Sequence, residues 1–151
     1  MNRRTAFQTG VAFALLLSLT SPAEDWPQWR GSNRDGVWSE TGILESFPKE
    51  DLKMRWRTPV WPGWSSPVVA GGRVYLTDMR LDKPRAWERI RCFKESNGKP
   101  LWSYDSELVY PDWAFIPEHG GGPAATPIVE AGKVYCFGRS GQVDCLAARN
   151  G

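Results

Sequence analysis

Cysteine and histidine are scarce in this sequence of 151 residues, which contains three cysteines and one histidine, His119. A single histidine excludes a histidine-rich metal site and a catalytic triad backed by a second imidazole base. The motif Gly-x-Ser-x-Gly is also absent, so residues 119–122 (HGGG), which imitate the oxyanion loop of lipases and esterases, have no nucleophile elbow to serve. We therefore expect a flexible loop before a strand at residues 119–122, and we predict no catalytic residue.

Long hydrophobic runs are absent after residue 23. The first 23 residues have the pattern of a signal peptide: Arg3 and Arg4 supply positive charge, residues 11–19 are apolar, and residues 21–23 (SPA) form a cleavage pattern. The apolar run has about half of the roughly 20 residues that cross a bilayer, which argues against a permanent anchor. We expect cleavage after Ala23 and a mature chain, residues 24–151, that is periplasmic or secreted and has no transmembrane segment.

The route of export stays open. Arg3-Arg4 followed by Thr5 has the look of a twin-arginine (Tat) signal, but paired arginines are also common in general secretory (Sec) signals. A bacterial lipoprotein needs a cysteine at the cleavage point, whereas the first cysteine here is Cys92. We therefore expect no lipid anchor.

An excess of charge of either sign is absent from the mature chain. Removing residues 1–23 takes away two of the 19 Lys and Arg residues and none of the 17 Asp and Glu residues, which leaves 17 of each. Binding to nucleic acid depends on a basic stripe that neutralises phosphates, and here the two signs are interleaved along the chain. We expect no nucleic-acid partner.

What the sequence does contain is an internal repeat. Residues 66–75 (SPVVAGGRVY) recur as residues 126–135 (TPIVEAGKVY), and residues 92–98 (CFKESNG) recur as residues 145–151 (CLAARNG). A third match joins Lys53–Trp56 (KMRW) to Lys99–Trp102 (KPLW). The shifts are 60, 53 and 46 residues, so the first copy carries seven extra residues, which we expect in loops. Short strands with one tryptophan in a repeat of variable length are typical of a β-propeller blade.

The local patterns agree with strands. Residues 67–69 and 74–77 are rich in β-branched and aromatic side chains and flank Ala70-Gly71-Gly72, which predicts a hairpin because glycine reaches the positive φ of a tight turn. The second copy has the same pattern around Ala131-Gly132, and another hairpin is expected around residues 139–141. No helical periodicity is sustained in the mature chain, so we predict an all-β fold.

Residues 96–102 (SNGKPLW) resemble the tryptophan-docking repeat of propellers of the pyrroloquinoline-quinone (PQQ) type, whose blades carry Asp-Ala-x-Thr-Gly-Lys-x-x-Trp. Gly98, Lys99 and Trp102 match this pattern, and Glu95 and Asn97 are near matches. Residues 25–36 (DWPQWRGSNRDG) look like the start of many exported PQQ-like repeat proteins of planctomycete-type bacteria. Residues 122–127 (GPAATP) resemble the Gly-Pro-x-Ala-Thr-Pro segment of that family.

The resemblance implies an architecture and a role for two tryptophans. In that family the tryptophan packs between neighbouring blades, so Trp56 and Trp102 are expected to be structural docking residues with hydrogen-bonded indole N–H groups rather than ligand-stacking residues. Family members form closed rings of about seven or eight blades. This sequence holds about two and stops where the next docking element would follow, so we expect an incomplete β-propeller, from a truncated product or part of a longer chain.

The resemblance leaves two functions open. Quinoprotein alcohol dehydrogenases of this fold bind PQQ and calcium, use an aspartate base and have a disulfide between adjacent cysteines, whereas this sequence has no adjacent cysteines and no assignable calcium ligands. The favoured hypothesis is a non-catalytic binding or scaffold module with a protein or carbohydrate partner, comparable to the propeller subunit of the outer-membrane β-barrel assembly machinery (BamB-type). The alternative is a fragment of a PQQ-dependent oxidoreductase. No cofactor-binding or metal-binding residue is predicted.

The cysteines and the acidic residues carry the remaining predictions. A two-residue turn at Ser140-Gly141 would place Cys136 opposite Cys145, where a disulfide is conceivable, but Cys145 also occupies the repeat position of Cys92, which favours packed thiols. Six carboxylates are expected in or near loops, and we assign none of them a function. They are Asp78, Asp82, Asp105, Glu107, Asp112 and Glu118.

Overall fold

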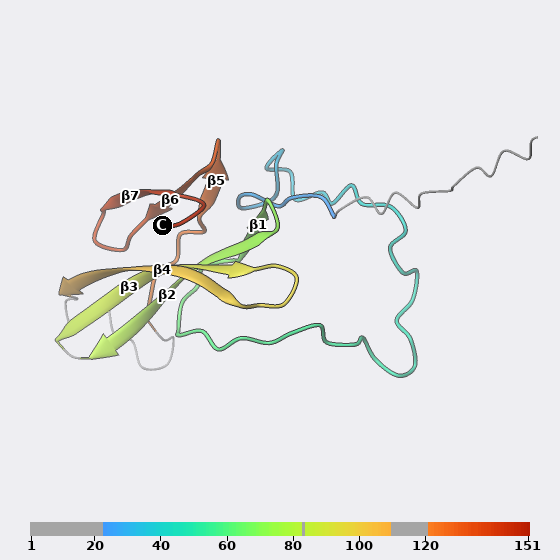
Figure 1. Ribbon diagram of the computed structural model, residues 1–151, viewed down its shortest axis with the longest axis horizontal. Helices are drawn as coiled ribbons and strands as arrows, with labels where there is room; N and C mark the ends of the chain where they lie inside the picture. The colour runs from blue at the N-terminus through green and yellow to red at the C-terminus, as the bar shows by residue number, and fades with distance from the viewer. Residues whose placement is uncertain (1–22, 83, 110–120) are drawn as a thin grey trace, which may run out of the picture.

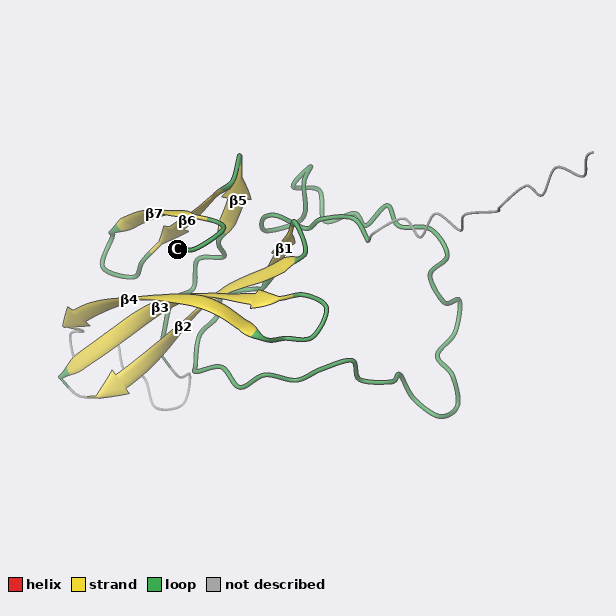
Figure 2. Ribbon diagram, in the orientation of Figure 1, coloured by secondary structure: helices red, strands yellow, loops and turns green. Residues whose placement is uncertain are grey.

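The computed structural model describes residues 23–82, 84–109 and 121–151. These residues contain strands, turns and loops and no helix (Figure 2), so the predicted all-β class is confirmed. It follows that the described residues include no helix able to span a membrane. The proposed signal peptide lies almost wholly outside them. The strands are β1 (Val68–Ala70), β2 (Arg73–Asp82), β3 (Arg85–Lys94), β4 (Pro100–Val109), β5 (Ile128–Glu130), β6 (Lys133–Phe137) and β7 (Val143–Ala147).

The strands form two antiparallel sheets that lie against each other (Figure 1). The first sheet has the order β1-β2-β3-β4, and the second has the order β5-β6-β7. Within each sheet, every strand pairs with the next one along the chain, so both sheets are meanders built from consecutive hairpins. Such sheets need only short connections, and four of the five connections within the sheets contain glycine.

The first hairpin of each sheet closes through a two-residue turn, as the sequence predicts. Ala70 pairs with Arg73, and the intervening Gly71 and Gly72 have φ angles of 57° and 71°. Positive φ at both central positions matches the right-handed twist of the flanking strands, and glycine adopts it without steric cost. In the second sheet Ala131 takes the first of these positions with a φ of 46°.

The repeat seen in the sequence is also a repeat of register. Tyr75 in β2 lies opposite Cys92 in β3, and Tyr135 in β6 lies opposite Cys145 in β7. The seven extra residues of the first copy do not form a loop, which corrects the expectation. They lengthen the second hairpin instead, so that β2 and β3 have 10 residues each, whereas β6 and β7 have five. The first sheet thus extends well beyond the second.

The hydrophobic core lies between the two sheets. Tyr75 and Cys92 of the first sheet and Val134 of the second are at most 1% exposed. Side chains along a strand point alternately to the two faces of the sheet, so each sheet presents one face to the core between the sheets and the opposite face away from it. The buried members of the core are Val68, Tyr75, Ile90, Cys92, Val134 and Cys136.

Two tryptophans dock on glycine turns in the same way, 46 residues apart. The Trp102 indole N–H donates to the carbonyl of Ala148 at 3.1 Å, and a Cβ added to Gly151 would lie 3.2 Å from the Trp102 ring. Trp56 donates to the Glu95 carbonyl at 2.6 Å, and a Cβ at Gly98 would lie 2.5 Å from its ring. The expected hydrogen bonds of the indole N–H groups are confirmed for both tryptophans, and each ring lies on a glycine turn. Trp102 thereby joins the first sheet to the second.

The segment between residues 37 and 60 is a wide excursion away from both sheets (Figure 1). It contains no strand, and its apolar side chains are largely exposed to solvent: Phe47 is 80% exposed. The segment rejoins the first sheet at Trp56. The other large exposed hydrophobic residues of this segment are Val37, Trp38, Ile43, Leu44, Leu52, Met54 and Val60.

Candidate binding groove

The N-terminal loop, residues 25–36, is hydrogen-bonded to one edge strand of each sheet, β1 in the first and β5 in the second. Trp26 forms a two-way backbone bridge with Val69 of β1, with N–O distances of 2.8 and 2.9 Å. The next residue, Pro27, accepts a hydrogen bond from the Val129 amide of β5 at 2.8 Å. A strand edge offers backbone groups to any extended partner, and here the chain itself occupies both edges at these positions.

The loop is held in shape by its own hydrogen bonds. The Gln28 carbonyl accepts from the Gly31 amide at 3.1 Å, and the Arg30 carbonyl accepts from the Gly36 amide at 2.9 Å. The side chain of Gln28 is bonded at both ends, since its amide donates to the Ser32 carbonyl at 3.0 Å and its oxygen accepts from Arg34 Nε at 3.1 Å. These contacts fix the backbone of the loop and the side chains of Gln28 and Arg34.

A groove of about 630 Å³ lies beside this loop. A volume of this size falls within the range of small-molecule sites. Trp29 and Trp64, each 61% exposed, both line it. Trp64 is positioned by its amide, which donates to the Pro123 carbonyl at 2.9 Å. The described residues that line the groove are Gln28, Trp29, Arg30, Arg34, Trp64, Ala124, Thr126 and Ile128.

Two smaller hollows adjoin the groove and share part of its lining. One, of about 210 Å³, shares Gln28, Trp29 and Arg30. The other, of about 450 Å³, shares Gln28 and Arg34 with the groove. It also includes Glu130, the one carboxylate among the described residues that line these three spaces. The N-terminal loop therefore borders a hollow surface larger than any one of the three.

The two arginines of the groove have no acidic partner among the described residues. Arg30 Nη2 donates to the Asp35 carbonyl at 3.0 Å, and Arg34 binds Gln28, but neither guanidinium forms an ion pair with a described carboxylate. Both residues have positive φ, 65° for Arg30 and 60° for Arg34. This backbone conformation costs a non-glycine residue on the order of 1 kcal/mol and is concentrated at functional sites.

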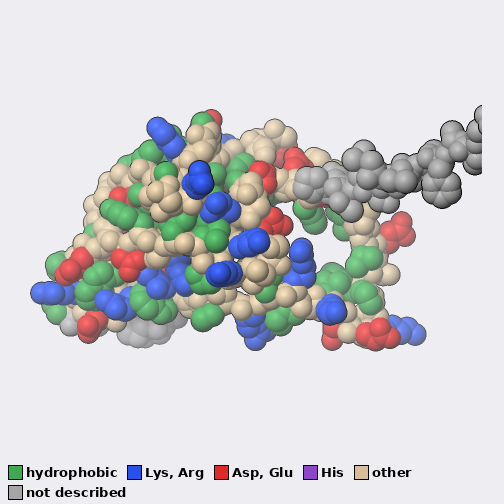
Figure 3. Space-filling model, viewed as in Figure 1, with side chains coloured by type: hydrophobic (Ala, Val, Ile, Leu, Met, Phe, Trp, Pro, Cys, Tyr) green, Lys and Arg blue, Asp and Glu red, His purple; other side chains and the backbone are tan. Residues whose placement is uncertain are grey.

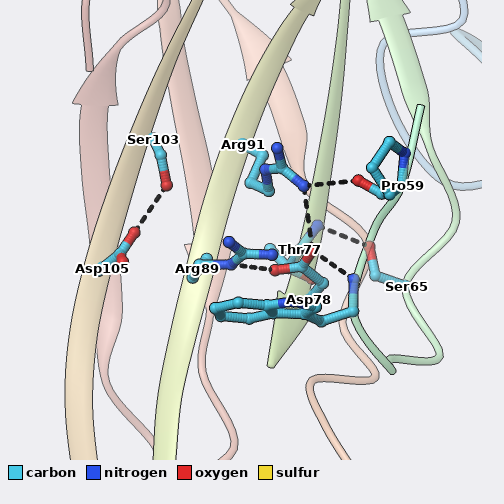
Figure 4. Close-up of polar contacts among 9 residues, drawn as sticks. Pro59, Ser65, Thr77, Asp78, Arg89, Arg91, Ser103 and Asp105 are labelled. Atoms are coloured by element: carbon cyan, nitrogen blue, oxygen red, sulfur yellow. Dashed lines mark hydrogen bonds and ion pairs between the residues drawn. The ribbon is translucent and has the colours of Figure 1, made fainter. Parts of the chain in front are cut away.

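A second polar cluster, shown in Figure 4, lies in the first sheet. Asp78 is fully buried and receives Arg89 through two hydrogen bonds of 2.6 and 2.7 Å. The Trp61 amide donates to the same carboxylate at 2.9 Å, and Arg91 Nη1 lies 3.6 Å from it. The Arg89 guanidinium also lies over the Trp61 ring, 3.2 Å from its centroid. Both carboxylate oxygens of Asp78 are therefore bonded within the protein.

The Asp78 cluster serves to fasten the chain segment around Trp61 to the first sheet. A bidentate carboxylate–guanidinium pair with an additional backbone donor satisfies a buried charge and leaves the carboxylate no open position for a ligand. Glu88, 6% exposed, plays a comparable part between the sheets, because its carboxylate accepts from the Arg139 amide at 3.2 Å and from Gln142 Nε2 at 3.1 Å. We regard both carboxylates as structural.

The three cysteines are free thiols, and the disulfide geometry considered above is wrong. Cys136 lies opposite Asp144, and Cys145 lies opposite Tyr135, because Arg139, Ser140 and Gly141 form a three-residue loop closed by the Gly138 amide and the Gln142 carbonyl at 2.9 Å. The loop is one residue longer than expected, so the register moves by one and the two cysteines point to opposite faces.

The thiols differ in exposure and in acidity. Cys92 and Cys136 are buried between the sheets, whereas Cys145 is exposed on the outer face of the second sheet. Burial raises the pKa of Cys136 to about 12, with a smaller contribution from the charge of Asp144. Burial also raises the pKa of Cys92, and the nearby Arg73 opposes that rise. Both buried thiols are thus unreactive packing groups.

The expected loop positions of the acidic residues are partly wrong. Asp78 and Asp82 lie in β2, and Asp105 and Glu107 lie in β4. The structure does not bring these four together: Asp78 is in the cluster of Figure 4, Glu107 forms an exposed ion pair with Arg85, and Asp105 accepts from Ser103. Asp112, Glu118, His119 and Gly120 lie outside the described residues, whereas Gly121 and Gly122 belong to a loop before β5. Within the described ranges no three His, Cys, Asp or Glu side chains could hold a metal ion.

The surface charge agrees with the interleaving seen in the sequence. On the face drawn in Figure 3, basic and acidic side chains are mixed over both sheets. The grouping of two unpaired arginines with two exposed tryptophans at the groove differs from this background. Sequence reasoning noted residues 25–36 only as a family-like block and missed the groove, because its lining comes from three segments far apart in the chain.

Comparison with models of known protein families gives no match for this chain, and comparison with curated proteins gives none either.

Proposed function

We propose that this chain is part of an exported β-propeller and works as a non-catalytic binding module, with the groove beside residues 25–36 as its ligand site. The single observation that carries the binding proposal is the groove itself. It is preformed by hydrogen bonds, it has the volume of a small-molecule site, and it combines exposed aromatic side chains with guanidinium groups that lack acidic partners.

The repeated sheets support the propeller part of the proposal. Propellers stack similar sheets around an axis, and each sheet covers a face of its neighbour. The first sheet buries Val68 and Cys92 against the second sheet, whereas the equivalent Ile128 and Cys145 of the second sheet are exposed. The outer face of the second sheet around Cys145 is therefore open to a further sheet stacked in the same manner.

The docking of the tryptophans supports a further sheet on the other side of the pair, before the first sheet. Trp56 binds the first sheet just as Trp102 of the first sheet binds the second, so the segment around Trp56 occupies the position of a fourth strand from a preceding sheet. The resemblance of residues 25–36 and 96–102 to PQQ-like repeat proteins leads to the same proposal. With the signal-peptide pattern of residues 1–23, it favours a periplasmic or secreted protein.

The function is tested by presenting the mature chain, residues 24–151, to an array of neutral and acidic saccharides and of peptides. We expect one class to be retained, and to be lost in the variant Trp29→Ala. A matched control is Trp38→Ala, since Trp38 is similarly exposed, at 55%, but does not line the groove. If the Trp29→Ala variant still bound every component that the unchanged chain binds, the groove would not be the ligand site.

A separate arm tests the oxidoreductase alternative. PQQ and calcium are added to the mature chain, and the bound quinone is followed by its absorption spectrum. A stoichiometric complex that oxidises alcohols with an artificial electron acceptor would contradict the non-catalytic proposal. We expect neither a stoichiometric complex nor turnover.

A further inference from the structure

We infer that the groove binds an acidic saccharide, in which sugar rings lie against Trp29 and Trp64 and a carboxylate or sulfate group binds Arg30 and Arg34. This inference rests on the proposed function, because it names the ligand class of the same groove.

The charge of the groove selects an anion. Among the described residues, its lining contains two guanidinium groups and no carboxylate. Asp35, which follows Arg34 directly in the sequence, accepts from the Val37 amide through its Oδ1 at 2.9 Å. Guanidinium groups donate in a planar fork that matches carboxylate and sulfate oxygens, and one fork position on each arginine is already fixed by a contact within the loop. The remaining N–H groups of Arg30 and Arg34 are therefore oriented donors.

The aromatic content of the groove selects a ligand with flat apolar faces. Trp29 and Trp64 remain 61% exposed although each lies in a segment fixed by backbone hydrogen bonds. A tryptophan presents a large rigid surface with a polar N–H, and such a side chain favours amphipathic partners. Sugar rings combine apolar C–H faces with hydroxyl groups, and Gln28 and Thr126 supply side-chain polar groups to the same lining.

The backbone of the groove disfavours an extended peptide. A peptide that adds to a sheet edge needs unpaired strand N–H and C=O groups. Here Trp26 already pairs with Val69 of β1, and Pro27 already accepts from Val129 of β5. The ligand is therefore held by side chains, as suits a saccharide, and not by strand pairing.

The experiment measures binding of four probes to the mature chain by calorimetry: trigalacturonate, a heparin-derived tetrasaccharide, neutral maltotriose and an Asp/Glu-rich peptide. We expect at least one acidic saccharide to bind about tenfold or more tightly than maltotriose, since hydrogen bonds between charged groups discriminate at this level. Its affinity should fall when salt is raised from about 0.1 M to about 1 M, because the screening length falls from about 10 Å to about 3 Å. Trigalacturonate and the heparin fragment distinguish carboxylate from sulfate.

The variants locate the binding. Arg30→Gln and Arg34→Gln should each weaken binding of the acidic saccharide about tenfold, and Arg34→Lys should weaken it less, since the charge remains while the planar fork is lost. The control Arg55→Gln removes an exposed arginine outside the groove and should change the affinity less than about twofold. Unchanged melting temperatures of the variants show that the fold is intact.

The outcomes separate the inference from the proposed function. Equal binding of maltotriose and the acidic probes, abolished by Trp29→Ala, would overturn the acidic class while the groove remained a ligand site. Binding of the acidic peptide alone would overturn the saccharide. Acidic-saccharide binding that Arg30→Gln and Arg34→Gln leave unchanged would overturn the placement. Absence of binding by all four probes would overturn the inference, and the wider array described above would then decide the proposed function separately.

Discussion

Removal of the Asp78 carboxylate should strongly destabilise this protein. The side chain is fully buried, and its two oxygens receive Arg89 at 2.6 and 2.7 Å and the Trp61 amide at 2.9 Å. Asp78→Ala leaves Arg89, whose side chain is 12% exposed, without its partner. Breaking a buried pair by removing one member costs about 3–5 kcal/mol, because the remaining charge is uncompensated.

This cost is large relative to the total stability of a domain, which is on the order of 5–15 kcal/mol. At this chain length it corresponds to a fall in melting temperature of roughly 10–20 °C. The assay is urea unfolding of the mature chain followed by tryptophan fluorescence. A double-mutant cycle adds Arg89→Ala, which should cost much less in the Asp78→Ala background than in the wild type, since the two side chains interact directly.

The matched control is Asp105→Ala in β4. Asp105 is exposed and accepts a hydrogen bond of 2.6 Å from Ser103, so its removal should change the free energy of unfolding by no more than about 0.5 kcal/mol. If Asp78→Ala were no more destabilising than Asp105→Ala, the reasoning that the buried pair fastens the Trp61 segment to the first sheet would be refuted.

Three further predictions concern the docking turn and the thiols. Gly98→Ala should lower the free energy of unfolding in urea by about 2–4 kcal/mol, because Ala there would have a positive φ and would also clash with the Trp56 ring. Gly71→Ala should cost about 1 kcal/mol, because Gly71 also has a positive φ but has open space around it. Equal costs of the two substitutions would exclude the docking contact. Alkylation followed by mass spectrometry should label Cys145 first in the native protein, and equally fast labelling of Cys136 would contradict its burial. Burial raises the pKa of the Cys136 thiol from near 9 to about 12. The contribution of this thiol to stability is therefore complete below pH 9 and should be lost between about pH 9 and 12, by up to about 1.4 kcal/mol per pH unit. The free energy of unfolding of Cys136→Ala should decline less steeply over this range, and an unchanged slope would contradict the assignment.

The sequence was sufficient to predict turns and strands, because these depend on residues that are adjacent in the chain. The hairpin at Gly71-Gly72 follows from two adjacent residues that tolerate positive φ, and the strands beside it follow from β-branched and aromatic runs. The hydrogen-bonded indole N–H of Trp102 was also expected, from the resemblance to PQQ-type repeats, whereas its contact with the turn at Gly151 was not.

Features that depend on register or on distant segments could not be predicted. One residue more in the loop at residues 139–141 turns Cys136 and Cys145 to opposite faces, and no residue pattern distinguishes that loop from a two-residue turn. The buried pair of Asp78 and Arg89 depends on strands β2 and β3 extending in register where a loop was expected. The groove joins residues 28–34, Trp64 and residues 124–128, which only the stacking of the two sheets brings together.

The central claim, that the groove beside residues 25–36 is the binding site of this module, is tested most directly by the footprint of a bound ligand. Hydrogen–deuterium exchange of the mature chain is measured with and without the array component that it retains. The account predicts slower exchange in residues 26–36, around Trp64 and in residues 124–129, with no change in β4. Protection confined to β3 and β4, with the N-terminal loop unchanged, would contradict it.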